Sequence, residues 1–166
     1  MLFNSYIFVF LFFPVSLAGY WLCVKAVEKK GRSFLPSLFL VAASLLFYGY
    51  LKPAYLPVLL VSLLVNFAFY RQIEKKKEKK AFLAVGIFLN LLVLGIFKYT
   101  GSTFVPLGIS FFTFSQIAFL MEGYRGSLKR TSLLDYSVYL TFFPKIMEGP
   151  IALPTDFLPA YQESGK

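Results

Sequence analysis

The chain has 166 residues, and its 17 Lys and Arg residues against 8 Asp and Glu residues give a formal net charge of +9. Hydrophobic residues make up 58% of the chain and charged residues 15%, whereas a typical soluble domain has about 45–50% and about 25%. Together with a mean hydropathy of +0.68, this composition excludes a disordered chain, a disulfide scaffold and an ordinary cytosolic enzyme.

Five stretches of the chain contain no Asp, Glu, Lys or Arg and are long enough to cross a bilayer. They are Met1–Val24, Ser33–Leu51, Pro53–Tyr70, Ala81–Phe97 and Tyr99–Met121. A membrane-spanning helix needs roughly 20 apolar residues, within a range of about 17–25. Because lipid cannot satisfy backbone amides, each stretch is expected to be helical. The sequence therefore predicts an all-α, polytopic helical membrane protein with about five transmembrane helices.

The basic residues between these stretches alternate in number. The loops after the first, third and fifth stretches hold 13 Lys and Arg residues, and the other two loops hold only Lys52 and Lys98. This asymmetry follows the positive-inside rule and predicts an extracytoplasmic N-terminus. The net charge is thereby explained without nucleic acid. The run Arg71–Lys80 could also bind anionic lipid head groups, but we interpret it first as a topology determinant.

The pattern changes after residue 131. The charge-free segment Tyr136–Pro144 is too short to cross a bilayer, and Lys, Glu, Gly and Pro residues follow it at once. Such a segment survives at membrane depth only when it is buried in protein or lines a cavity. We therefore expect a re-entrant or half-inserted C-terminal segment, packed against helices that this chain may not contain. Ser132 and Asp135 are spaced as a capping box that starts a helix.

The fifth stretch carries the most unusual polar pattern. Ser110, Thr113 and Gln116 are three residues apart and share one side of a helix, next to Pro106 and Gly108, which would bend or interrupt it. These side chains could wall a substrate tunnel, or they could be interhelical hydrogen-bonding groups. Spacing alone favours the second interpretation.

Lys145 and Glu148 are a second candidate pair. They stand three residues apart, within reach on one helical face, and could mark a pathway through the membrane or form a simple ion pair. The chain contains no histidine, which removes the commonest general base and metal ligand. We therefore expect no catalytic residue, no metal site and no bound cofactor within these residues.

Several motifs resemble one family when taken together. They are Met1-Leu2-Phe3-Asn4-Ser5-Tyr6, Phe97-Lys98-Tyr99, Pro106-Leu107-Gly108-Ile109-Ser110-Phe111-Phe112-Thr113-Phe114, Tyr124-Arg125-Gly126, Phe142-Phe143-Pro144, Gly149-Pro150-Ile151 and Asp156-Phe157-Leu158-Pro159. In this order they resemble bacterial membrane-bound O-acyltransferases of the alginate O-acetyltransferase type. The resemblance covers essentially all 166 residues.

The resemblance implies a single incomplete domain, residues 1–166, that forms the N-terminal part of an enzyme of the bacterial inner membrane. Such an enzyme moves an acyl group, usually acetyl, from acetyl-CoA or a carrier-linked donor to an extracytoplasmic acceptor such as an exopolysaccharide. The family's catalytic histidine lies beyond the matched region. The implied partners are the lipid bilayer, the C-terminal portion of the enzyme and an extracytoplasmic acetyltransferase.

A second interpretation remains open beside this one. The chain could be a catalytically inactive, truncated membrane protein that acts as a scaffold or is a remnant. A transporter half is a weaker third alternative, because neither paired repeats nor matched discontinuous helices are present.

Overall fold

The computed structural model describes residues 8–30, 34–51, 53–75, 79–99, 106, 108–128, 131–142 and 153–164. These residues form helices joined by short turns, and none of them lies in a strand. The all-α prediction is therefore confirmed for the described part of the chain. The elements in chain order are a π-helical turn η1 (Phe8–Phe12), α1 (Phe13–Lys30), α2 (Leu35–Leu51), a 3-10 turn η2 (Pro53–Tyr55), α3 (Leu56–Lys75), α4 (Lys79–Tyr99), α5 (Ile109–Arg125), α6 (Leu133–Thr141) and α8 (Pro154–Ser164).

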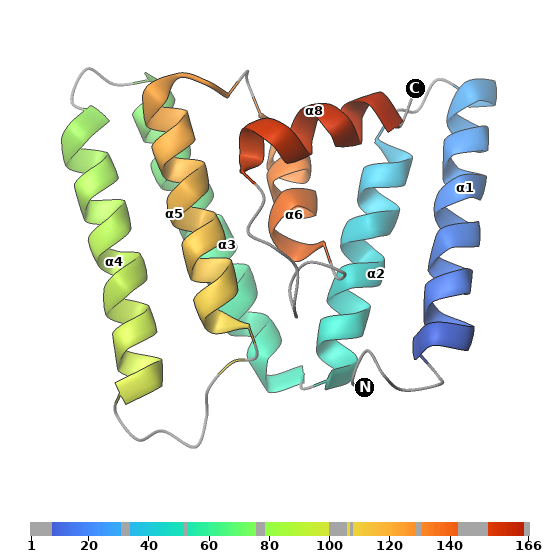
Figure 1. Cartoon of the computed structure of the whole chain (residues 1–166), viewed down its shortest axis with the longest axis horizontal. Helices are drawn as coiled ribbons and strands as arrows, with labels where there is room; N and C mark the ends of the chain where they lie inside the picture. Colours follow the sequence, from blue (N-terminus) through green and yellow to red (C-terminus); the bar gives the residue numbers. More distant parts are fainter. Residues whose placement is uncertain are drawn as a thin grey trace.

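The helices α1 to α5 are roughly upright and run alternately up and down (Figure 1). Helix α1 stands at one edge and α4 at the other, and α5 packs against both α3 and α4. Because α3 and α5 both run away from the same end, they are parallel to each other. The described basic residues gather at the end where α1, α3 and α5 finish, and Lys98 lies at the opposite end; those gathered are Lys25, Arg71, Lys75, Lys79, Lys80 and Arg125.

The lengths of the helices bear on the number of membrane spans. Within the described residues, the segments Pro53–Lys75 and Lys79–Tyr99 are long and apolar enough to cross a membrane. Two further apolar helices, Phe10–Ala26 and Leu35–Tyr50, are shorter. Two helices of the described part therefore have the length and composition of membrane spans, and the expected total of about five stays a prediction.

The fifth stretch does not form one helix as expected. Tyr99 ends α4, and α5 begins only at Ile109 and continues past Met121 to Arg125. Gly108 has a φ of 70°, which a residue with a Cβ rarely adopts, and the Ile109 amide donates to the Pro106 carbonyl at 3.2 Å. The expected bend is thus a turn that starts the helix.

Helix α6 is short and enclosed. Every residue from Tyr136 to Thr141 is buried, and α6 packs against α2, α3, α5 and α8. The chain's own helices thus pack against α6, and the rest of the expected re-entrant segment, residues 143–152, lies outside the described residues. The predicted capping box is confirmed: the Ser132 hydroxyl accepts from the Asp135 amide at 3.1 Å and donates to its carboxylate at 2.8 Å.

Helix α8 lies across the end of the bundle from which α6 starts (Figure 1). The first residues of α6 and the whole of α8 are therefore at the same end of the bundle. The Tyr161 hydroxyl is 2.7 Å from the Ser37 hydroxyl, which ties α8 to the start of α2. Burial raises the pKa of Tyr161, and its hydrogen bond to Ser37 lowers it to a smaller extent.

The core is aromatic where α3, α5 and α6 meet. The Phe119 ring lies 4.8 Å from the Tyr70 ring, 4.4 Å from the Tyr136 ring and 5.9 Å from the Tyr139 ring, centroid to centroid. Close approach of α3 and α5 depends on Gly123, because a Cβ there would lie 2.7 Å from the Tyr70 ring. Small residues let helix backbones approach in this way.

Replacing Gly123 with alanine is expected to destabilise the packing of α3 against α5, since the Tyr70 side chain is 1% exposed and cannot move aside. Overpacking of this kind costs about 1–3 kcal/mol. Gly95→Ala is the matched control, because nothing lies within 4 Å of the Cβ it would add. Thermal unfolding of the purified chain in detergent measures the difference. Equal melting temperatures for the two variants would contradict this account of the packing.

Candidate functional site

Three amide side chains meet where α3, α4 and α5 pack together. The Asn66 amide of α3 donates to the Asn90 side-chain oxygen of α4 at 3.2 Å, and the Asn90 amide donates back to the Asn66 oxygen. The Asn66 nitrogen also lies 3.0 Å from the Gln116 oxygen of α5. All three residues are buried. They form one polar network, which we call the amide cluster, in an otherwise apolar part of the bundle.

Neighbouring groups complete the hydrogen bonding of the amide cluster. The Ser62 hydroxyl donates to the Gln116 oxygen at 2.9 Å. The two asparagine nitrogens also donate to backbone carbonyls of their own helices, Asn66 to Ser62 and Asn90 to Gly86. The asparagine amides therefore have little hydrogen-bonding capacity left for a ligand.

The Gln116 nitrogen is different. It is buried and has no hydrogen-bond partner in the described part of the chain, and the same is true of the Tyr136 hydroxyl and the Ser115 hydroxyl. The Gln116 side chain lies beside the Tyr136 hydroxyl without the geometry of a hydrogen bond. An unpaired buried polar group costs about 1–3 kcal/mol. The mostly aromatic contact between α5 and α6 thus contains three polar groups that have no hydrogen-bond partner in the described residues.

A groove of about 390 Å³ runs between α3 and α4 beside the amide cluster. Its surface is nearly all apolar, and Thr113 of α5 is part of its wall. This volume lies within the range of ordinary small-molecule pockets, about 300–1,000 Å³. The groove, which we call the α3–α4 groove, is lined by Pro57, Val58, Val61, Ser62, Val65, Asn66, Phe69, Gly86, Leu89, Asn90, Val93, Phe97 and Thr113.

The structure brings together only part of the predicted stripe. Thr113 lines the groove and Gln116 joins the amide cluster, whereas Ser110 is half-buried and is not among the lining residues. The interhelical role considered for these side chains fits Gln116, and the tunnel role stays a prediction. Lys145 and Glu148 lie outside the described residues.

Sequence reasoning missed Ser62, Asn66 and Asn90. A signal was available, because an asparagine in the middle of a membrane-length apolar stretch needs a partner. The stretches Pro53–Tyr70 and Ala81–Phe97 contain one asparagine each, and those two residues bind each other.

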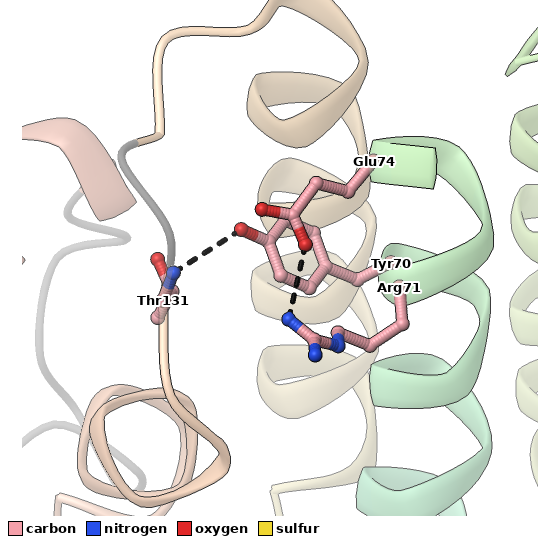
Figure 2. Close-up of polar contacts among 4 residues, drawn as sticks. All are labelled: Tyr70, Arg71, Glu74 and Thr131. Carbon is pink, nitrogen blue, oxygen red and sulfur yellow. Dashed lines mark hydrogen bonds and ion pairs between the residues drawn. The ribbon is translucent and has the colours of Figure 1, made fainter. Parts of the chain in front are cut away.

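Two ion pairs within single helices lie among the described residues at the end of the bundle with the basic residues. Arg71 donates to Glu74 at 3.1 Å in α3, and the Tyr70 hydroxyl accepts from the Thr131 amide at 3.4 Å (Figure 2). Arg125 donates to the nearly buried Glu122 at 2.8 Å in α5. The Tyr70–Thr131 contact ties the start of α6 to α3. In the described residues, no group of three or more His, Cys, Asp or Glu side chains could hold a metal ion.

Mutation of the asparagine pair is expected to show strong coupling. Asn66→Leu leaves the Asn90 amide buried without this partner, at a cost of about 1–2 kcal/mol, and the reverse holds for Asn90→Leu. The double variant should lose less free energy of unfolding than the two single variants added together, since it leaves neither asparagine amide buried without its partner.

The measurement for the asparagine pair is equilibrium unfolding in mixed micelles. Gln72→Leu, at an exposed position on α3, is the control and should change stability little. Additive single effects would contradict the direct pairing of Asn66 with Asn90.

The chain is similar in sequence to several known proteins. It is 29% identical to a peptidoglycan O-acetyltransferase of Helicobacter pylori over 98% of the chain and 39% of that protein. It is 28% identical to a probable alginate O-acetylase, AlgI, of Pseudomonas aeruginosa over 91% of the chain and 32% of that protein. It is 32% identical to a teichoic acid D-alanyltransferase of Lacticaseibacillus rhamnosus over 59% of the chain and 26% of that protein.

The chain therefore spans between about a quarter and two fifths of the length of these relatives. No family model matches it, and no solved structure matches it significantly. The resemblance carried by its motifs is confirmed: the chain is homologous to members of the membrane-bound O-acyltransferase family.

Proposed function

We propose that these residues form part of an integral membrane O-acyltransferase that transfers an acyl group, acetyl in the first instance, to an extracytoplasmic polysaccharide. The observation that carries the proposal is the similarity of nearly the whole chain to a peptidoglycan O-acetyltransferase and to alginate O-acetylases. These relatives differ in acceptor, and each acceptor named is a polymer of the cell envelope or an exopolysaccharide. The acceptor proposed for this chain is of the same class.

The charges support one orientation in the bacterial inner membrane. The described basic residues gather at the end where α1, α3 and α5 finish. Under the positive-inside rule this end is cytoplasmic, and the N-terminus is extracytoplasmic. Helices α1 to α5 then cross the bilayer, while α6 starts at the cytoplasmic side and α8 lies across the bundle on that side.

The absence of histidine from these residues supports a proposed enzyme whose catalytic base lies outside them. None of the 166 residues is a histidine, and the relatives are considerably longer than the matched region. We infer that polypeptide beyond these residues supplies the catalytic base. The acyl donor, acetyl-CoA or a carrier-linked acyl group, would meet the cytoplasmic end, and an extracytoplasmic acetyltransferase would complete the transfer. Helices α1 to α6 would provide part of the wall around the reaction.

The proposed function is tested by acetyl transfer to cell-surface polysaccharide in a strain that lacks its own transferase. The chain is expressed with and without a separately encoded, histidine-bearing remainder of the enzyme. We expect O-acetyl content to be restored only when both are present. Activity from the 166 residues alone would contradict the inferred source of the base. No activity in either case, with both pieces located in the membrane, would contradict the acyltransferase proposal and favour a scaffold.

The proposed orientation is tested by cysteine labelling, for which the single native cysteine, Cys23, is first replaced by serine. Tyr99→Cys lies at an 81% exposed position at the end opposite the basic residues, and Lys75→Cys lies at the basic end. In intact spheroplasts, a membrane-impermeant maleimide should label Tyr99→Cys, and it should label Lys75→Cys only after permeabilisation. The reverse pattern would invert the orientation.

A further inference from the structure

The α3–α4 groove has the length of one bilayer leaflet. Its lining on α3 runs from Pro57 to Phe69, and its lining on α4 runs from Gly86 to Phe97. At a rise of 1.5 Å per residue, these spans are about 18 Å and about 17 Å long. Half of a bilayer hydrocarbon core is about 15 Å thick. An extended hydrocarbon chain that enters at the Pro57 and Phe97 end would reach the level of the amide cluster.

The groove is open at its side to whatever surrounds the bundle. Val61, Val65 and Leu89 line it and are also 60%, 43% and 37% exposed. Helix α4 has no ionisable side chain between Ala81 and Phe97 and leaves most of its surface uncovered. A helix that is apolar on all sides is suited to a lipid environment. Within the described residues the groove is therefore open at this side, and under the proposed placement the medium around the bundle is membrane lipid.

The hydrogen bonding of the groove's polar groups suits a mostly apolar ligand that carries one hydrogen-bond acceptor. The side chains of Ser62, Asn66 and Asn90 already form hydrogen bonds with Gln116, with each other and with backbone carbonyls. Thr113 is 1% exposed and lines the groove, and its hydroxyl makes no hydrogen bond within the described residues. Since Gln116 contacts Ser62 and Asn66, and α5 is parallel to α3, Thr113 lies nearer the Pro57 end. A ligand can thus gain one hydrogen bond near the groove entrance and only apolar contact beyond it.

We propose that the α3–α4 groove binds one acyl chain of a membrane phospholipid, whose ester carbonyl accepts a hydrogen bond from the Thr113 hydroxyl. The inference rests on the membrane placement in the proposed function and not on acyl transfer itself. The bound chain fills the space between α3 and α4 and thereby supports the edge helix α4.

The test uses the full chain in vesicles of phosphatidylethanolamine and phosphatidylglycerol that contain a phosphatidylglycerol with a diazirine in its acyl chain. After illumination, mass spectrometry of peptides locates the attached lipid. We expect labelling to concentrate on the groove residues of α3 and α4. Val65→Trp fills the groove and should reduce labelling there at least about fivefold, whereas Leu64→Trp, at a neighbouring exposed position outside the groove, should leave it unchanged.

Thr113→Val keeps the shape of the side chain and removes the hydroxyl. One hydrogen bond contributes about 0.5–1.5 kcal/mol, so groove labelling should fall about two- to tenfold while labelling of other exposed faces is unchanged. Val61→Trp replaces Val65→Trp if circular dichroism shows that the latter does not fold. Even labelling over all exposed faces, insensitive to Val65→Trp and Val61→Trp, would overturn the proposal. So would unlabelled groove residues beside labelled Leu64, because polypeptide would then cover the groove.

No acetyl transfer is measured in this experiment. A failed lipid site therefore leaves the acyltransferase proposal standing, and a failed acyltransferase proposal leaves the lipid site standing.

Discussion

The reciprocal hydrogen bonds between Asn66 and Asn90 are the contact on which the arrangement of α3, α4 and α5 depends. Apolar side chains pack against lipid as well as they pack against each other, so they hold an edge helix such as α4 only weakly. Two asparagines facing lipid would leave their amides unsatisfied, and pairing removes that cost. The pair fixes the register of α4 against α3, and Gln116 extends the same constraint to α5.

The same requirement for satisfied polar groups explains α6. A nine-residue helix has too few apolar residues to cross a bilayer, so its ends must be buried or capped within the protein. Ser132 and Asp135 cap its start, and the aromatic rings of Tyr70 and Phe119 enclose it from α3 and α5. Gly123 permits this enclosure because it has no Cβ that would meet Tyr70. Because Gly123 has no side chain, α3 and α5 approach each other closely enough to bury α6.

The candidate site follows from where α3, α4 and α5 leave space between them. The amide cluster holds the three helices together beside the groove. The apolar side chains of Val61 and Val65 line the groove and are exposed at its edge. Of the polar residues that line the groove, Thr113 is the one whose side chain makes no hydrogen bond within the described residues. In the described residues, the surroundings of the groove are therefore mostly apolar.

The sequence by itself determined the helical class, the approximate limits of α2 and α4, the cap at Ser132 and the homology, because apolar length, charge placement and capping are local properties of the chain. It also singled out Thr113 and Gln116 by their spacing. Only the tertiary structure decided that Asn66 meets Asn90, that α5 begins at Ile109, and that the chain's own helices enclose α6. These features depend on which helix faces lie opposite each other, and a periodic pattern within one helix does not specify its neighbours.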